Sequence, residues 1–242
     1  METLSKNSKG GAEDKICFVS VDVEDGTERM EEILDIFKKY SISATLFVTG
    51  EVLQARSELV QEWSRNHEIA SHSFTHRFWS GLGQEERRKE LKDFISLYQD
   101  IFGQKPKGFR APSHVIDAQG LALLKESGFL YDSSILPHYP PFKKYRGYQG
   151  KKPRQIHFII DGLLEIPVAG HFWGVPLAGA WVTKLPGWFY RILFFFYQPR
   201  FIALSWHSWD RLKNLERIIK LLKSQGYHFL NGEQICTLFI PK

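Results

Sequence analysis

The chain has 242 residues, of which 43% are hydrophobic and 24% charged, so it is long enough for one sizeable core and has the composition of a globular protein. Only two cysteines occur, Cys17 and Cys236, at a spacing that excludes both a disulfide framework and a cysteine metal site. The net charge of +5 suits an anionic substrate or a phosphate-rich surface, but no nucleic-acid-binding motif accompanies it, so we expect no nucleic-acid partner.

The first fifteen residues are polar and charged. Residues 1–15 lack the apolar core of a secretory signal, so we expect a disordered lead-in and a cytoplasmic protein. The remaining residues, 16–242, show no internal repeat or linker, and we expect them to form a single domain.

Strands and helices alternate through the first half of the chain. The apolar runs predict strands over about 16–22, 44–48, 68–71, 108–110 and 129–131, and helices over about 27–40, 51–65, 91–102 and 117–127. Strict alternation predicts a parallel sheet with helices outside it, either open or closed into a barrel.

The second half is less regular. Residues 137–154 and 171–186 read as long loops, separated by a strand over 163–166. A strand over 201–205, a helix over 212–222, a strand over 227–229 and a short helix capped by Asn231 follow. The strongly apolar run 188–197 is too short to span a bilayer, and we expect a buried helix there, with a helix at a membrane interface as the alternative.

Two histidines follow the predicted strand at 68–71. His72 and His76 are four residues apart, and on a helical turn this spacing places two imidazoles on one side, about 5–6 Å apart at Cβ. Two neutral imidazoles at that distance can share a metal ion. Taken alone, the pair is more often two polar loop residues.

Three carboxylates end the first strand. Asp22, Glu24 and Asp25 would be costly to bury without partners. Asp22 and Glu24 share a face because side chains alternate along a strand, whereas Asp25 lies beyond the strand. The C-terminal ends of parallel strands open on the same side, so Asp22, His72, Arg110 and His207 are predicted to converge.

These residues lie in motifs that occur in the order found in a known family. The chain resembles the polysaccharide deacetylases with a NodB homology domain, also called carbohydrate esterase family 4, over roughly 16–239. The motifs that carry this resemblance are Ser20-Val21-Asp22-Val23-Glu24-Asp25-Gly26, His72-Ser73-Phe74-Thr75-His76, Arg110-Ala111-Pro112, Leu130-Tyr131-Asp132-Ser133-Ser134 and Leu204-Ser205-Trp206-His207. The first motif departs from the family's Thr-Phe-Asp-Asp-Gly, so either Glu24 or Asp25 would replace the family's metal-binding aspartate.

The resemblance implies a distorted (β/α) barrel and metal-assisted hydrolysis of an N-acetylated amino sugar. A divalent ion, with zinc expected, would lie on His72, His76 and one carboxylate. Asp22 would be the base, with Arg110 as its partner, and His207 would protonate the departing amine.

The resemblance also suggests where the saccharide contacts the chain. Pro112, Ser113 and Trp206 are the expected substrate-binding residues, with a backbone N–H near Ser113 stabilising the oxyanion. The tryptophans near His207 offer faces for sugar rings, namely Trp173, Trp181, Trp206 and Trp209. The alternatives are a metal-free hydrolase of a cyclic amide and an inactive carbohydrate-binding protein; a lipid-linked saccharide would suit a membrane-interface helix at 188–197.

Overall fold

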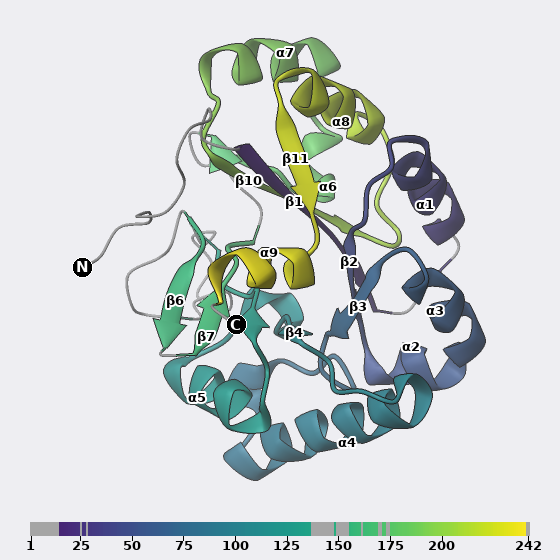
Figure 1. Ribbon diagram of the computed structural model, residues 1–242, viewed down its shortest axis with the longest axis vertical. Coiled ribbons are helices and arrows are strands. Elements are labelled where there is room, and N and C mark those ends of the chain that lie inside the picture. The colour runs from purple at the N-terminus through teal and green to yellow at the C-terminus, as the bar shows by residue number, and fades with distance from the viewer. Residues whose placement is uncertain are drawn as a thin grey trace.

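One curled β-sheet runs through the protein (Figure 1). The computed structural model of the chain describes residues 15–24, 26–27, 29–136, 148, 155–160, 162–168, 171–172 and 175–240. Within them the sheet follows the order β10-β1-β2-β3-β4-β5-β7-β6, and β11 pairs with the beginning of β1. Every pair in this sheet is parallel except β6 with β7.

The strands of this sheet are β1 (Lys15–Val23), β2 (Thr45–Val48), β3 (Glu68–Ser71), β4 (Gly108–Phe109), β5 (Tyr131–Asp132), β6 (His157–Ile160), β7 (Leu163–Glu165), β10 (Phe201–His207) and β11 (Tyr227–Leu230). The short strands β8 (His171–Phe172) and β9 (Val175–Pro176) form a separate antiparallel pair. Among the described residues β6 and β7 do not pair with β10, so the barrel is open there.

The helices are α1 (Met30–Lys39), α2 (Gly50–Ala55), α3 (Ser57–Ser64), α4 (Gln84–Phe102), α5 (Ala118–Ser127), α6 (Gly179–Val182), α7 (Gly187–Phe196), α8 (Leu215–Ser224) and α9 (Gly232–Phe239). Figure 1 shows α1, α3, α4, α5, α7 and α8 around the outside of the curled sheet, while α9 lies across one of its ends. The distorted (β/α) barrel that the sequence predicts is confirmed.

Strand β1 shows how the sequence builds the site. Its odd-numbered residues from Cys17 to Val23 pack into the large apolar cluster beneath the outer helices. Its even-numbered residues point the other way because side chains alternate along a strand. Phe18 therefore packs in the barrel interior, and Ser20 and Asp22 follow it toward the C-terminal end of the strand.

The interior has an apolar floor. One layer combines a residue from each of six strands with two from α9, namely Phe18, Phe47, Ala70, Tyr131, Leu164, Ala203, Ile235 and Cys236. Helix α9 covers the N-terminal end of the barrel, where Gly232 and Glu233 donate backbone hydrogen bonds to Thr45 and Glu68. Asn231 caps α9 by accepting from Gln234, as the sequence predicts. Ser20, Asp22 and Arg110 lie on the other side of this floor, toward the C-terminal ends of the strands.

Several boundaries differ from the sequence prediction. The helix expected over 51–65 is two helices, because the backbone at Arg56 leaves the helical region (φ −135°, ψ 35°). The stretch 171–186, expected to be a loop, contains β8, β9 and α6. Lys15 belongs to β1 rather than to a lead-in, and residues 1–14 and most of the predicted loop 137–154 lie outside the described residues.

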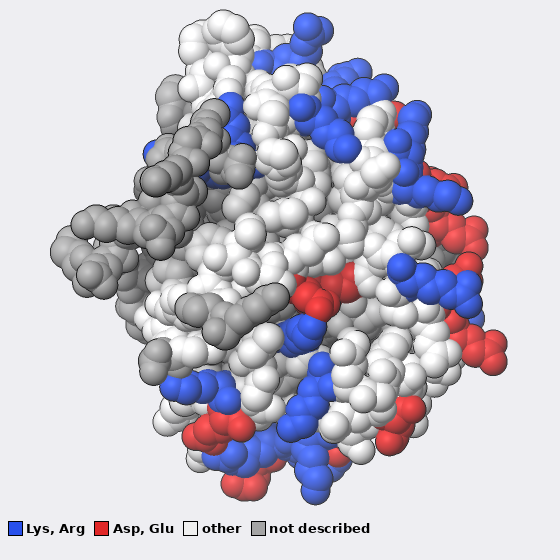
Figure 2. All heavy atoms as spheres, in the orientation of Figure 1, with Lys and Arg blue, Asp and Glu red and all other residues white. Residues whose placement is uncertain are grey.

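Charge is unevenly spread over the surface. Figure 2 shows Lys and Arg side chains along the upper part of the molecule, where α7 and α8 lie, beside an uncharged surface. Acidic side chains are more frequent along the right-hand edge of the same view.

Candidate functional site

Three side chains at the C-terminal ends of β1 and β3 converge on one point. Glu24 Oε1 lies 3.1 Å from His76 Nε2 and 3.6 Å from His72 Nε2. One ligand atom from each of the three residues lies within 4.8 Å of the other two. Asp25, the alternative carboxylate, lies outside the described residues. The structure therefore supplies Glu24 as the acid beside the histidine pair.

The chemistry of this group fits a divalent metal ion. His72 Nδ1 lies 2.9 Å from the backbone oxygen of Arg110, which only accepts, so Nδ1 carries the proton and the Nε2 lone pair faces Glu24. The Nε2 atoms of His72 and His76 are both buried and make no hydrogen bond. An ionised carboxylate and two imidazole lone pairs are a donor set that zinc accepts.

The histidine pair is not on a helical turn, contrary to the geometry assumed from the spacing. His72 directly follows β3, and the chain then turns through two residues with positive φ, Ser73 (66°) and His76 (56°). The imidazole centroids nevertheless lie 4.9 Å apart. Non-glycine residues with positive φ are uncommon and are found where surrounding contacts impose them.

Glu90 on α4 imposes this loop conformation. Its carboxylate accepts hydrogen bonds from Ser73 Oγ, from the backbone N–H of Phe74 and Thr75, and from Thr75 Oγ1, at 2.6–2.9 Å. Because Glu90 is 4% exposed, these charge-assisted bonds are made away from water. Sequence reasoning missed Glu90, whose position on a helix gives no signal of contact with a loop 15 residues earlier.

Asp22 and Arg110 form a buried ion pair above the apolar floor. Arg110 Nη1 donates to Asp22 Oδ1 at 2.6 Å and to Ser20 Oγ at 2.9 Å, and its Nε and Nη2 donate to Ser133. The guanidinium lies 4.0 Å from the ring centroid of Phe47. Burial opposes ionisation of Asp22, but Arg110 and nearby histidines outweigh it and hold the pKa of Asp22 well below its usual range. The second oxygen, Oδ2, is buried and has no hydrogen bond.

His207 lies across from Asp22. The two residues are paired in the parallel register of β1 and β10, and His207 Nε2 lies 4.0 Å from Glu24. Asp210 Oδ2 contacts His207 Nδ1 at 3.0 Å and also accepts from the His207 backbone N–H. Burial would lower the pKa of His207, but the bond to Asp210 and the nearby carboxylates outweigh it and raise that pKa above its ordinary value. Sequence reasoning missed Asp210.

The loop after β4 holds a strained segment beside the site. Pro112 is buried and Ser113 is half-buried, and both Ser113 (φ 56°) and His114 (φ 58°) have left-handed backbones. His114 Nδ1 is buried without a hydrogen bond, and burial lowers the pKa of His114 to about 3. His114 was not among the residues predicted from the sequence, although it lies two positions beyond the Arg-x-Pro motif.

Trp206 cannot bind a sugar ring as expected. Trp206 is 1% exposed within the apolar cluster under the outer helices. It is paired with Val21 on β1 and, because side chains alternate along a strand, it points to the opposite side of β10 from His207. Trp209 is the better candidate for contact with a sugar ring, because it is exposed. Its ring stacks on His207, with centroids 4.8 Å apart and planes at 19°. Trp173 and the side chain of Trp181 lie outside what the structure describes.

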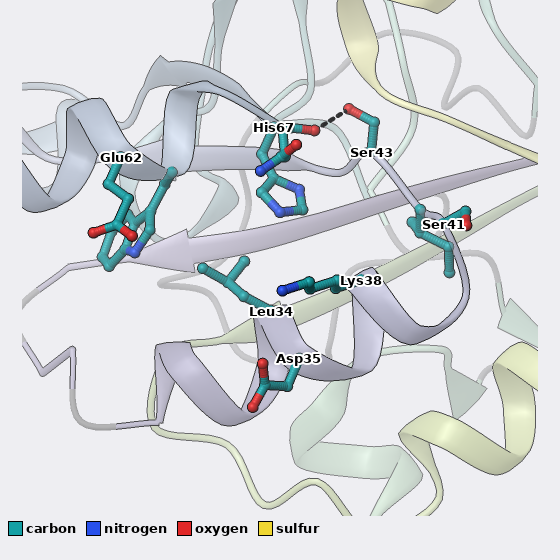
Figure 3. Close-up of a pocket in the computed structure, with 10 residues that line it drawn as sticks. Leu34, Asp35, Lys38, Ser41, Ser43, Glu62 and His67 are labelled. Atoms are coloured by element: carbon teal, nitrogen blue, oxygen red, sulfur yellow. Dashed lines mark hydrogen bonds between the residues drawn. The ribbon is translucent and has the colours of Figure 1, made fainter.

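A hollow of about 440 Å³ lies elsewhere, between α1 and α3 (Figure 3). It is lined by residues such as Asp35, Lys38, Glu62 and His67, and Ser43 Oγ donates to the backbone of Asn66 at its edge. The lining residues Ser43 and His67 lie in the loops that precede β2 and β3. The hollow is therefore at the N-terminal end of the barrel, away from Glu24. Its mixed charged lining has no part in the group described above.

The fold and the site define a (β/α)-barrel protein with a candidate metal site at the C-terminal ends of its strands. The sequence profile of the family described as Polysaccharide deacetylase matches residues 9–131, just over half of the chain. The chain belongs to the polysaccharide deacetylase family.

Comparison with individual proteins agrees with this family assignment. The peptidoglycan deacetylase of Helicobacter pylori is 28% identical over 127 residues, which cover 52% of this chain and 43% of that protein. A putative polysaccharide deacetylase from Mycobacterium smegmatis superposes with a TM-score of 0.68 at 20% identity, covering 98% of this chain and 94% of the other. A carbohydrate esterase family 4 pseudoenzyme from Bacillus anthracis superposes with a TM-score of 0.64 at 18% identity, covering 92% and 66%. The chain spans less than two thirds of the length of the first curated relatives that it matches.

Proposed function

We propose that this protein is a metal-dependent hydrolase that removes the N-acetyl group from an amino sugar in a saccharide chain. The observation that carries the proposal is the convergence of Glu24, His72 and His76 beside Asp22 and His207. Family relatives named peptidoglycan deacetylase and chitin deacetylase support the choice of an N-acetylated saccharide.

The proposed reaction divides between two proton-transfer groups. A divalent ion held by Glu24, His72 and His76, with zinc expected, would polarise the acyl carbonyl and acidify the attacking water. Asp22 Oδ2, which has no hydrogen bond, accepts the proton of that water as its hydroxyl adds to the acyl carbon. The C–N bond then breaks, His207 gives a proton to the departing amine, and acetate leaves.

Two further residues hold these groups in place. Arg110 fixes one oxygen of Asp22 and leaves the other for the water. Asp210 binds Nδ1 of His207, so Nε2 is the nitrogen that faces the site. The backbone N–H of Ser113 would stabilise the oxyanion, because the N–H groups of His114 and Val115 already donate to Ala111 and Pro112. Trp209 offers its exposed face to a sugar ring.

The test is an acetate- and formate-release assay with N-acetylglucosamine oligomers and peptidoglycan fragments, with and without added zinc. We expect His72→Ala and Asp22→Asn to lose at least about a hundredfold in kcat, the typical loss when an acid–base group is removed. Glu31→Gln, which removes an exposed carboxylate on α1, is the matched control and should keep full activity. Thermal unfolding would show that each variant is folded.

Binding of the metal is measured separately. The metal-free protein is titrated with Co²⁺, whose visible absorption reports a low-coordinate site, and Glu24→Gln and His76→Ala are compared with the wild type. Equal affinity of all three proteins would contradict the ligand assignment. Saccharide binding without release of acyl product would favour an inactive binding protein, and turnover that is unchanged by chelation would favour the metal-free alternative.

A further inference from the structure

Helix α7 has two apolar faces. Its inner face consists of Gly187, Tyr190, Leu193 and Phe194, which are buried against the sheet and α8. The side chain of Arg217 on α8 lies over Gly187, where a Cβ atom would be 1.5 Å from Nη1 and would displace this exposed side chain. The inner face packs α7 against the rest of the protein. The prediction of a buried helix is therefore right for this face only.

The outer face of α7 is apolar but exposed. Trp188, Ile192, Phe195 and Phe196 are 62%, 52%, 72% and 77% exposed. Their spacing of i, i+4, i+7 and i+8 places them on one stripe of the helix. Four large apolar side chains in one stripe, three of them aromatic, form an exposed patch of the kind that marks an interaction surface.

The segment of the chain that contains this stripe is basic. Residues 179–226, which contain α6, α7 and α8, hold eight Lys or Arg and two Asp or Glu, a net charge of +6 against +5 for the whole chain. Arg191 lies within α7 and is exposed, and Arg217 packs against its first residue. Figure 2 shows Lys and Arg side chains beside an uncharged surface at the top of the molecule, where Figure 1 places α7.

We propose that the outer face of α7 docks on a membrane surface that contains anionic lipid, with the helix lying in the interfacial plane. Apolar and aromatic residues would enter the acyl boundary while Arg and Lys contact the headgroups. A second copy of the chain is a poor occupant, because the basic residues of this segment in the two copies would repel each other. No helix among the described residues is long and apolar enough to cross a bilayer.

Helix α7 is connected to the candidate site by contacts within the fold. Tyr190 Oη of α7 donates to the backbone oxygen of Val182 in α6 at 3.0 Å. At the start of α6, Gly179 packs so closely on Asp210 that a Cβ there would lie 2.3 Å from its carboxylate. Asp210 in turn binds His207. The surface is thus tied through two helices to one of the two proposed proton-transfer residues.

The experiment is vesicle sedimentation of the purified full chain at low salt (about 0.02 M) and high salt (about 0.5 M). The vesicles contain phosphatidylcholine alone or with about one third phosphatidylglycerol, a composition that gives an anionic surface. We expect binding to the anionic vesicles at low salt and its loss at high salt. Phe195→Ser/Phe196→Ser should weaken binding by at least about tenfold, since each exposed phenylalanine would lose its burial in lipid.

Matched variants distinguish binding through the outer face of α7 from non-specific hydrophobic binding to lipid. Leu238→Ser removes an apolar side chain of α9 that is 62% exposed and should bind like the wild type. Arg191→Gln should weaken binding by about fivefold and reduce its salt dependence. Because no saccharide is involved, the result does not depend on whether the proposed deacetylation is correct.

Three outcomes would overturn the proposal. One is the absence of binding to anionic vesicles at low salt. Another is equal binding by the wild type and Phe195→Ser/Phe196→Ser. The third is a dimer in sedimentation equilibrium that this double variant dissociates, because a second copy would then occupy the face.

Discussion

Arg110 Nη1 lies 2.6 Å from Asp22 Oδ1, and the two side chains are 0% and 1% exposed. This ion pair joins the residue that follows β4 to β1 across the barrel interior, and both of its side chains are buried. A buried pair of this kind contributes little net stability, but it holds both groups in one arrangement. Its value to the protein is the fixed position of Asp22.

Removal of Arg110 should therefore be strongly destabilising. We expect Arg110→Met to lower the free energy of unfolding by about 3–5 kcal/mol, because Asp22 would be left as a buried charge without a partner. Urea unfolding measures this change. Arg88→Met, which breaks the exposed pair of Arg88 with Glu126, is the control and should cost less than about 1 kcal/mol. Similar small losses in both variants would show that Asp22 does not depend on Arg110.

Glu90 should control metal affinity without contacting the metal group. Glu90→Ala removes the acceptor of four hydrogen bonds from the loop that carries His76, so the loop should relax from its positive-φ conformation. We expect Co²⁺ affinity to fall by about tenfold to a hundredfold, as for other residues that orient ligands. Glu86→Ala, one turn earlier on α4 and half-exposed, is the control. Unchanged affinity in Glu90→Ala would mean that the loop holds its shape by itself.

Asp210 should affect turnover through His207. Asp210→Asn weakens the contact with His207 Nδ1 and lowers the pKa of the imidazole, so kcat should fall by at least about tenfold while KM changes little. Steady-state kinetics on an N-acetylated oligosaccharide measures both constants. If Asp210 acts through His207, the variant His207→Gln/Asp210→Asn should be no slower than His207→Gln alone. Additive losses of kcat in the double variant would show that Asp210 acts independently of His207.

A second buried acid pair predicts a pH dependence of stability. Asp132 and Glu165 are paired in the register of β5 and β7 and are both fully buried. Burial raises the pKa of Asp132 to about 6, and burial together with Asp132 raises the pKa of Glu165 well above its ordinary value. The folded state therefore keeps protons that the unfolded chain has already lost, so stability is highest below about pH 4 for this pair and declines as pH rises through 6.

Glu165→Gln isolates this effect. The glutamine keeps an oxygen to accept from the Ile135 backbone N–H but does not ionise. The stability of the variant relative to the wild type should rise between about pH 4.5 and pH 7, by an amount on the order of 2 kcal/mol. Urea unfolding at the two pH values measures it, with Glu126→Gln, an exposed acid on α5, as the control. A pH-independent difference would refute the raised pKa.

Sequence alone determined the class of fold and the family. The alternation of apolar strands with amphipathic helices is a local property, and it led correctly to a distorted (β/α) barrel. The order of short motifs at strand ends led to the polysaccharide deacetylase family, which the family profile also shows. Both inferences rest on periodicity and motif identity, which the chain carries residue by residue.

Tertiary structure decided what depends on contacts between distant segments. The path of the loop between His72 and His76 is set by Glu90 on another element, so the assumption of a helical turn was wrong. Trp206 is adjacent to His207 in sequence but faces the opposite side of β10, and the exposure of the outer face of α7 follows from where α8 packs. The path of a loop and the exposure of a side chain depend on which distant segments pack together. The local pattern of the sequence does not specify that packing.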